Sequence, residues 1–109
     1  MKSVAYIITR ENISELLEEN ILAPILKNEH GAPVAVFYFV GDGAYHLIKG
    51  SRNAKNIKAI MKMGQTAIYA CEASIKNRKL QNIILDGVKF GTLKDFYNAA
   101  SNVDYIISF

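Results

Sequence analysis

A single cysteine, Cys71, is the residue of this 109-residue chain whose type and position best suit covalent chemistry. It directly follows the apolar segment 66–70, which has the pattern of a short buried strand, and residues 75–80 behind it are compatible with a helix. A thiol between a strand and a helix lies close to unpaired helix N–H groups, which favour the thiolate. The sequence therefore makes Cys71 a candidate nucleophile.

The surroundings of Cys71 in the sequence favour a thiolate only in part. Residues 49–109 hold ten Lys/Arg against four Asp/Glu, whereas residues 1–48 hold three against six, so the cysteine lies in the basic half. The adjacent Glu72 opposes this effect, because a neighbouring carboxylate raises a thiol pKa. His46 is a candidate partner base, although a partly exposed loop histidine is its commoner state. A lone cysteine is also often a small buried hydrophobic residue, and this alternative stays open.

Composition and motifs exclude several classes of protein. Half of the residues are apolar, which is ample for a core and unlike a disordered chain. The longest apolar run, 32–40, is too short to span a bilayer, and the first residues show no secretory signal, so we expect no membrane partner. One cysteine excludes an internal disulfide and fits a reducing, cytoplasmic compartment. One Cys and two His make no zinc pattern, and phosphate-binding fingerprints are absent, so we expect neither metal nor cofactor.

The elements that must position Cys71 can be read from hydrophobic periodicity. Apolar, β-branched segments predict strands at residues 3–9, 33–40, 66–70, 88–90 and 103–108. Helical segments separate them, with an irregularity expected near Pro24 and a C-terminal cap at Gly31. Two polar residues followed three positions later by an acid predict capping boxes: Asn12 with Glu15, and Thr92 with Asp95. The alternation predicts one domain, 1–109, with a mostly parallel five-stranded sheet covered on both faces.

In such a sheet the functional site lies at the carboxyl ends of the strands. The segments at the carboxyl ends of predicted strands in this chain are Thr9-Arg10, Gly41-Asp42-Gly43 and Cys71. A Gly-Asp-Gly turn lets the backbone approach a ligand, although an ordinary strand-to-helix connection uses the same residues. We therefore expect these three segments to meet at one edge of the sheet.

A basic face on the helix expected at 52–63 is a weaker candidate. Its members share one side of the helix at spacings of three and four: Arg52, Lys55, Lys58 and Lys62. This pattern is typical of the solvated side of an amphipathic helix, and a phosphate-binding stripe is the alternative. No aromatic residues are interleaved and no nucleic-acid motif is visible, so we expect no nucleic-acid partner.

Taken together, the chemistry-bearing segments resemble those of a known family. Strand 33–40 followed by Gly-Asp-Gly, and then a Cys-x-x-Ser segment (Cys71, Ser74) with Arg78 shortly after, resemble the DsrE/DsrF-like sulfur-relay family, which includes the TusD-type proteins. The resemblance implies a three-layer α/β/α sandwich (DsrEFH-like) with strand order 4-3-2-1-5, assembled as homotrimers or hexamers. In its sulfur-transferring members, a cysteine in the region of Cys71 accepts a persulfide from one protein and passes it to another.

Two functions follow from these observations. In the first, a sulfurtransferase-like carrier, Cys71 attacks a donor persulfide, holds the outer sulfur and passes it to an acceptor protein. The rim of this site is expected to comprise Thr9, Arg10, Gly41, Asp42, Gly43, His46, Ser74 and Arg78. In the second, the protein is a non-catalytic module whose basic half binds a small anionic ligand or a partner protein, and Cys71 only packs. A thiol peroxidase is less favoured, because the chain has no resolving cysteine.

The expected assembly has a second, compositional argument. A chain of this size with aromatic residues near the same edge is expected to hide some of them between subunits. The residues considered for that role are Tyr38, Phe39 and Tyr45.

Overall fold

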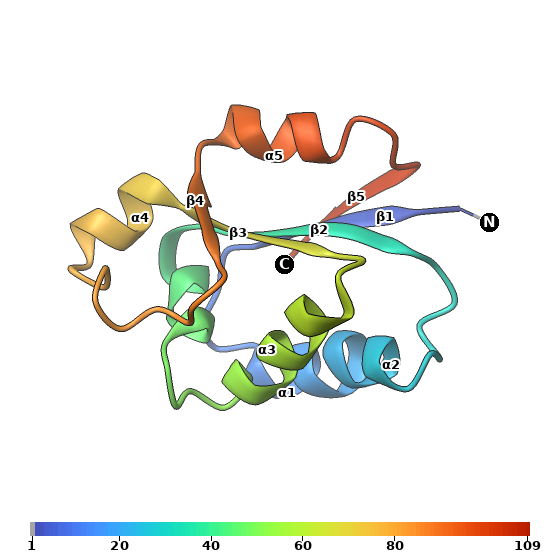
Figure 1. The fold of residues 1–109 in the computed structure, drawn as a ribbon, viewed down its shortest axis with the longest axis horizontal. Coiled ribbons are helices and arrows are strands. Elements are labelled where there is room, and N and C mark those ends of the chain that lie inside the picture. The colour runs from blue at the N-terminus through green and yellow to red at the C-terminus, as the bar shows by residue number, and fades with distance from the viewer. Residues whose placement is uncertain (1) are drawn as a thin grey trace.

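The computed structural model describes residues 2–109 and is built on a five-stranded sheet whose neighbouring strands all run parallel. The strands, in chain order, are β1 (Val4–Ile8), β2 (Val34–Phe39), β3 (Ala67–Cys71), β4 (Lys89–Gly91) and β5 (Tyr105–Ser108). Their order across the sheet is β4-β3-β2-β1-β5, and helices lie on both sides (Figure 1). The α/β/α class and the strand order expected from the sequence are confirmed.

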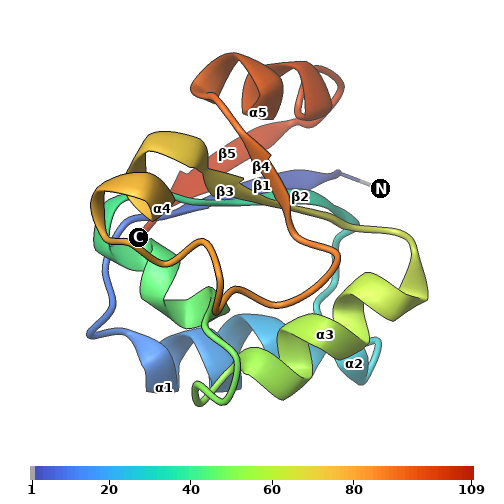
Figure 2. The same cartoon turned by 60° about the vertical axis from the view of Figure 1, so that its left-hand side comes forward.

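Helices cover the two faces of the sheet unequally. One face is covered by α1 (Ser14–Leu16), the π-helical turn η1 (Leu17–Leu22), α2 (Ala23–Leu26) and α3 (Ala54–Met63). The other face is covered by α5 (Leu93–Ala99) alone, as both ribbon views show (Figures 1 and 2). The remaining two helices, the 3-10 helix η2 (Gly41–Leu47) and α4 (Glu72–Asn77), follow the carboxyl ends of β2 and β3.

The first helical segment departs from the expected caps. Its N-cap is Ile13, without a side-chain hydrogen bond, so the capping box predicted at Asn12 is wrong because the helix begins one residue too late for it. The segment ends at Lys27, and Asn28 takes the left-handed conformation (φ 58°). Asn tolerates that conformation, so Gly31 is not needed as the cap. The irregularity predicted near Pro24 is confirmed as a π-helical turn followed by a restart at Ala23.

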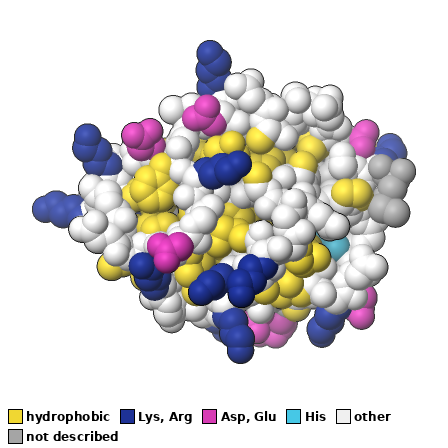
Figure 3. Space-filling model, viewed as in Figure 1, with side chains coloured by type: hydrophobic (Ala, Val, Ile, Leu, Met, Phe, Trp, Pro, Cys, Tyr) yellow, Lys and Arg dark blue, Asp and Glu magenta, His cyan; other side chains and the backbone are white. Residues whose placement is uncertain are grey.

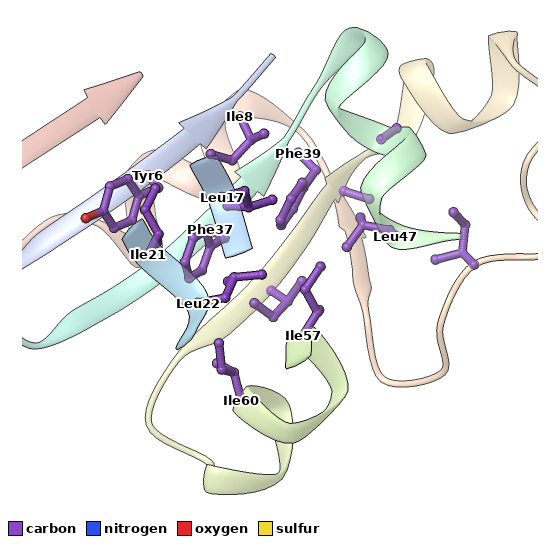
Figure 4. Packing of buried hydrophobic residues seen from close by; sticks show 14 of the residues in the cluster. Tyr6, Ile8, Leu17, Ile21, Leu22, Phe37, Phe39, Leu47, Ile57 and Ile60 are labelled. Carbon is purple, nitrogen blue, oxygen red and sulfur yellow. The ribbon is translucent and has the colours of Figure 1, made fainter. Parts of the chain in front are cut away.

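The larger core fills the space between the sheet and the helices α1–α3. Figure 4 shows how side chains from β1, β2, η1, η2 and α3 interdigitate there, and its labelled members are Tyr6, Ile8, Leu17, Ile21, Leu22, Phe37, Phe39, Leu47, Ile57 and Ile60. The rings of Phe37 and Phe39 stack with their centroids 5.9 Å apart. Alternation along β2 sends these two rings to one face and Tyr38 to the other.

A smaller core lies between α5 and the face of the sheet that α5 covers. It consists of Ala5, Val36, Tyr38, Phe96 and Ala100, with the Tyr38 and Phe96 rings stacked at 5.4 Å. The α5 helix begins at the capping box of Thr92 and Asp95 that the sequence predicts. Tyr38 and Phe39 are buried within the chain, so the expectation that they form an aromatic rim between subunits is wrong for these two residues. Tyr45 is half-buried against the larger core.

Hydrophobic side chains also reach the surface. Figure 3 shows several of them among the Lys and Arg side chains on the face seen in Figure 1. Exposed members on or beside α5 and on the edge strands include Phe90, Leu93, Tyr97, Tyr105 and Ile106. Among residues 2–109, no helix is both long enough and apolar enough to cross a membrane.

Candidate functional site

Cys71 lies where the chain turns from strand to helix, as the sequence predicts. It is the last residue of β3 and the N-cap of α4, with extended backbone angles (φ −64°, ψ 116°), and its side chain is half-buried. The helical backbone starts at the next residue, so the first N–H groups of α4 have no helical partner and lie near the sulfur. The strand-to-helix turn thus positions the thiol against backbone donors.

Hydrogen-bond donors make the Cys71 thiol more acidic than usual. Burial by itself raises the pKa of Cys71, but hydrogen bonds from the hydroxyls of Ser74 and Tyr38 and from the backbone N–H groups of Ser74 and Ala73 outweigh it and lower the pKa below its ordinary value. These donors are groups without a net charge. The acidity of the thiol therefore arises from local hydrogen bonding on the folded chain.

Tyr38 reaches the sulfur from the neighbouring strand. Its ring is only 2% exposed and stacks on Phe96, which fixes its direction. Burial, and then the proximity of Cys71 and Asp95, raise the pKa of Tyr38, so its hydroxyl keeps the proton and acts as a donor to the sulfur. The sequence does not single out this residue, because its role depends on the register that places β2 beside β3, with Tyr38 paired to Tyr69.

Ser74 joins the Cys71 turn to the Gly-Asp-Gly turn. Its side chain is buried, and its Oγ accepts a hydrogen bond from the Gly41 N–H at 2.8 Å. Because Gly41 occupies the oxygen as an acceptor, the Ser74 hydroxyl proton is available to the Cys71 sulfur. A relay thus runs from the Gly41 amide through Ser74 to Cys71, and it connects two of the three segments predicted to meet.

The Gly-Asp-Gly turn also has packing roles of its own. A Cβ atom at Gly43 would lie 1.9 Å from the backbone oxygen of Ile8, so only glycine lets η2 approach the end of β1 so closely. Asp42 accepts hydrogen bonds from Arg78 Nη2 at 3.0 Å and Nε at 3.3 Å, while Arg78 Nη1 donates to the Ser74 carbonyl oxygen at 3.3 Å. This ion pair fastens α4 to η2 behind the relay.

The remaining predicted rim residues lie at the end of β1. His46, expected to be partly exposed, is instead only 4% exposed, and its Nε2–H donates to the Arg10 carbonyl oxygen at 2.7 Å. Thr9 Oγ1 donates to the carbonyl oxygen of Phe109 at 2.8 Å. These contacts hold the loop after β1 against η2 and the chain end. They give His46 a structural hydrogen bond and do not bring it to Cys71 as a base.

A pocket of about 680 Å³ opens over Cys71 on the α5 side of the sheet. Its lining is largely apolar and includes Ile7, Val40, Ala73 and Leu93, together with Tyr38, Cys71, Glu72, Lys76, Gly91 and Thr92. Of the predicted site residues, all of which the structure describes, Cys71 alone lines this pocket. A smaller hollow of about 380 Å³ lies at the opposite ends of the strands and is lined by residues such as His30 and Gln65.

The basic face of α3 lies outside the Cys71 site. The Nε atom of Arg52 pairs with Glu18 Oε1 at 2.6 Å, and Lys55, Lys58 and Lys62 are exposed, as expected of the solvated side of α3. Within the described residues, no group of three or more His, Cys, Asp or Glu side chains could hold a metal ion.

The chain is similar in fold to solved proteins of low sequence identity. The ychN protein from E. coli matches with a TM-score of 0.72 and 17% identity, over 100% of both chains. MTH1491 from Methanobacterium thermoautotrophicum matches with a TM-score of 0.74 and 12% identity, over 98% of this chain and 99% of that one. BT1422 from Bacteroides thetaiotaomicron matches with a TM-score of 0.74 and 16% identity, over 99% and 95%.

Sequence comparison identifies the family directly. No curated protein matches the chain. The model of the DsrE/DsrF-like family, however, matches residues 2–109, which is nearly the whole length. The chain with this parallel sheet and this cysteine at the end of β3 therefore belongs to the DsrE/DsrF-like family.

Proposed function

We propose that the protein is a sulfur carrier that holds a persulfide on Cys71. The observation that carries the proposal is the thiol itself: the hydroxyls of Tyr38 and Ser74 and two backbone amides lower its pKa, and it faces an open pocket. A carrier needs a thiolate and access for a second thiol: the lowered pKa of Cys71 favours the thiolate, and the open pocket gives the access. Membership of the DsrE/DsrF-like family supports the same function.

The transfer proceeds by two thiol–persulfide exchanges. The Cys71 thiolate attacks the outer sulfur of a donor persulfide, the donor S–S bond breaks, and its electron pair leaves with the donor thiolate. Cys71 then holds one additional sulfur atom as a persulfide. An acceptor thiolate attacks that outer sulfur, and Cys71 leaves as a thiolate, so no external oxidant or reductant is consumed.

Tyr38 and Ser74 act on the same sulfur atom in both steps. Their hydroxyls stabilise negative charge on Sγ, both when Cys71 is the nucleophile and when it is the leaving group. Glu72 is exposed beside the pocket, so its carboxylate is solvated rather than buried against the sulfur. Uncharged hydrogen-bond donors therefore stabilise the Cys71 thiolate, a role that the sequence suggests for the Lys and Arg side chains of the basic half.

The carrier function can be tested by intact mass measurement. After exposure to inorganic polysulfide and removal of excess reagent, the protein should gain the mass of one sulfur atom, and a second thiol should remove it. Cys71→Ala, which changes a half-buried side chain, should fold and show no gain. A wild-type protein that alkylates only above the ordinary thiol pKa and never gains sulfur would favour the alternative, in which Cys71 only packs.

The proposal extends to assembly and partners. Apolar side chains exposed on α5 and β5, such as Tyr97 and Ile106, are candidates for burial between subunits. A homotrimer or hexamer is the assembly that the family resemblance implies, with donor and acceptor proteins delivering and removing the sulfur. Light scattering at micromolar concentration should then give a multiple of the 12.1 kDa chain, and the mass of a single chain would contradict this part of the proposal.

A further inference from the structure

We infer that the pocket over Cys71 selects sulfur donors and acceptors whose thiol is attached to an uncharged, apolar group. This inference rests on the proposed carrier function and concerns which thiols exchange with Cys71.

The walls of the pocket offer apolar contact on several sides of the sulfur. Ile7 and Val40 come from the ends of the central strands, Leu93 from the first turn of α5, and Ala73 from α4. None of these side chains has a polar atom. A group attached to the sulfur that exchanges with Cys71 therefore meets hydrocarbon, and a pocket of about 680 Å³ is large enough for a group of several carbon atoms.

The polar atoms in this part of the structure are already directed elsewhere. The buried hydroxyls of Tyr38 and Ser74 donate toward the Cys71 sulfur, and Ser74 also accepts from Gly41. The nearby Arg78 guanidinium is paired with Asp42 and bound to the Ser74 carbonyl oxygen. A carboxylate or ammonium next to the incoming sulfur would lose its hydrating water and would find no protein partner in the pocket. Burying such an unpaired charge is costly.

The charged residues around the pocket do not favour either sign of ligand. Glu72 and Lys76 both line it, four residues apart on α4, and both are exposed to solvent. Residues at this spacing share one helix face, so their opposite charges largely cancel at a distance. Cys71 should therefore exchange more slowly with reagents that carry either charge near the reacting sulfur, and faster with reagents that carry a larger apolar group.

Alkyl methanethiosulfonates provide the test, because a thiolate attacks their sulfenyl sulfur and releases methanesulfinate without any oxidant. Rates with Cys71 are measured for the methyl, ethyl, propyl and butyl reagents and divided by the rates with 2-mercaptoethanol. We expect an increase of up to about fourfold for each methylene group that becomes buried. The sulfonatoethyl and trimethylammonioethyl reagents should both react at least about tenfold more slowly than the butyl reagent on the same scale.

Two variants assign the selectivity to this pocket. Leu93 is 48% exposed at the start of α5, so Leu93→Ala should fold, and it should flatten the dependence on alkyl length. Leu16→Ala is the matched control, since Leu16 is 38% exposed at the end of α1 on the other side of the sheet and should leave the series unchanged. Equal effects of the two substitutions would overturn the assignment to the pocket.

Capped tripeptide persulfides distinguish the sources of such a group. If a cysteine between two leucines delivers sulfur faster than one between two aspartates, the pocket accepts an apolar protein segment. If the two peptides are equally slow while the alkyl series still rises, the carrier group is a small apolar thiol. Rates independent of alkyl length and of charge would refute the inference and leave the carrier function intact, whereas a Cys71 that reacts with no reagent would refute the carrier function itself.

Discussion

Replacing Tyr38 with phenylalanine removes one hydroxyl from the Cys71 site and little else. The Tyr38 ring is 2% exposed and stacked on Phe96, and phenylalanine preserves that packing. Among residues 2–109, the hydroxyl makes no hydrogen bond apart from its interaction with the Cys71 sulfur. The free energy of unfolding should therefore change by less than about 1 kcal/mol.

The effect on reactivity can be estimated from the charge that the hydroxyl stabilises. A hydrogen bond to a charged group contributes about 1.5–3 kcal/mol, and the half-buried sulfur justifies the lower end because solvent screens it. That loss raises the pKa of Cys71 by about one unit, so at a pH below both the wild-type and the variant pKa the variant holds about tenfold less thiolate. A thiolate of higher pKa is also a better nucleophile, by about threefold for this change, so the net rate of alkylation below both pKa values should fall only about threefold.

The pH profile of iodoacetamide alkylation separates this mechanism from general damage. In Tyr38→Phe the rate should fall at pH below the wild-type pKa of Cys71 and rise about threefold on the high-pH plateau, because the pKa and the intrinsic nucleophilicity of the thiolate increase together. Tyr69→Phe is the control, since Tyr69 lies on the same face of β3 two residues before Cys71 and does not line the pocket. An unchanged profile in Tyr38→Phe, or a fall at every pH, would refute the role assigned to Tyr38.

The other predictions concern the relay, the turn and the thiol. Ser74→Ala should slow alkylation at pH below the wild-type pKa of Cys71, because a hydroxyl that lowers this pKa is lost. It should also destabilise the protein by about 1–3 kcal/mol in urea titrations, because the Gly41 N–H loses its acceptor, and an unchanged stability would contradict the relay. Gly43→Ala should cost about 3 kcal/mol, because its Cβ would lie 1.9 Å from the Ile8 oxygen, whereas Gly31→Ala, with nothing within 4 Å but φ +85°, should cost only about 1 kcal/mol. Because folding lowers the pKa of Cys71, the stability of the wild type relative to Cys71→Ala should rise with pH between the lowered pKa and the ordinary value of 9.0. This added stability should be lost as pH falls through the lowered pKa. A difference in urea midpoints that shrinks as pH rises would contradict the lowered pKa.

The fold could be predicted because its signals are local and repeated. Strands covered on both faces, such as β2, have continuous apolar sequences, and the turn at Cys71 follows because small residues end β3 just before a helical segment. The capping box at Thr92 is also a local pattern and was predicted correctly. The similar pattern at Asn12 failed because the helix start depends on how η1 packs against the core, which the spacing of two residues does not specify.

The sequence predicts which segments form the site, but not which side chains make the contacts between them. The carboxyl-end rule brings Cys71 and the Gly-Asp-Gly turn to one edge, but it does not reveal that Ser74 is the contact between them. Nor does it identify Tyr38, because alternation within β2 gives the face of that side chain while only the register with β3 places it at the sulfur. Residue type alone makes His46 a candidate base, whereas its hydrogen bond to the Arg10 carbonyl oxygen depends on a contact that sequence spacing cannot locate.

The neutral donors around Cys71 have a consequence for the response of the site to ionic strength. A thiolate held by a lysine or arginine loses stabilisation in concentrated salt, because counterions screen the charge pair. Hydroxyl and amide groups that hydrogen-bond the sulfur carry no net charge and are screened far less, and the nearby Arg78 guanidinium is already paired with Asp42. The nucleophile of this protein should therefore keep its reactivity across wide changes in salt, while any loosening of β2, η2 or α4 removes a donor and makes it an ordinary thiol.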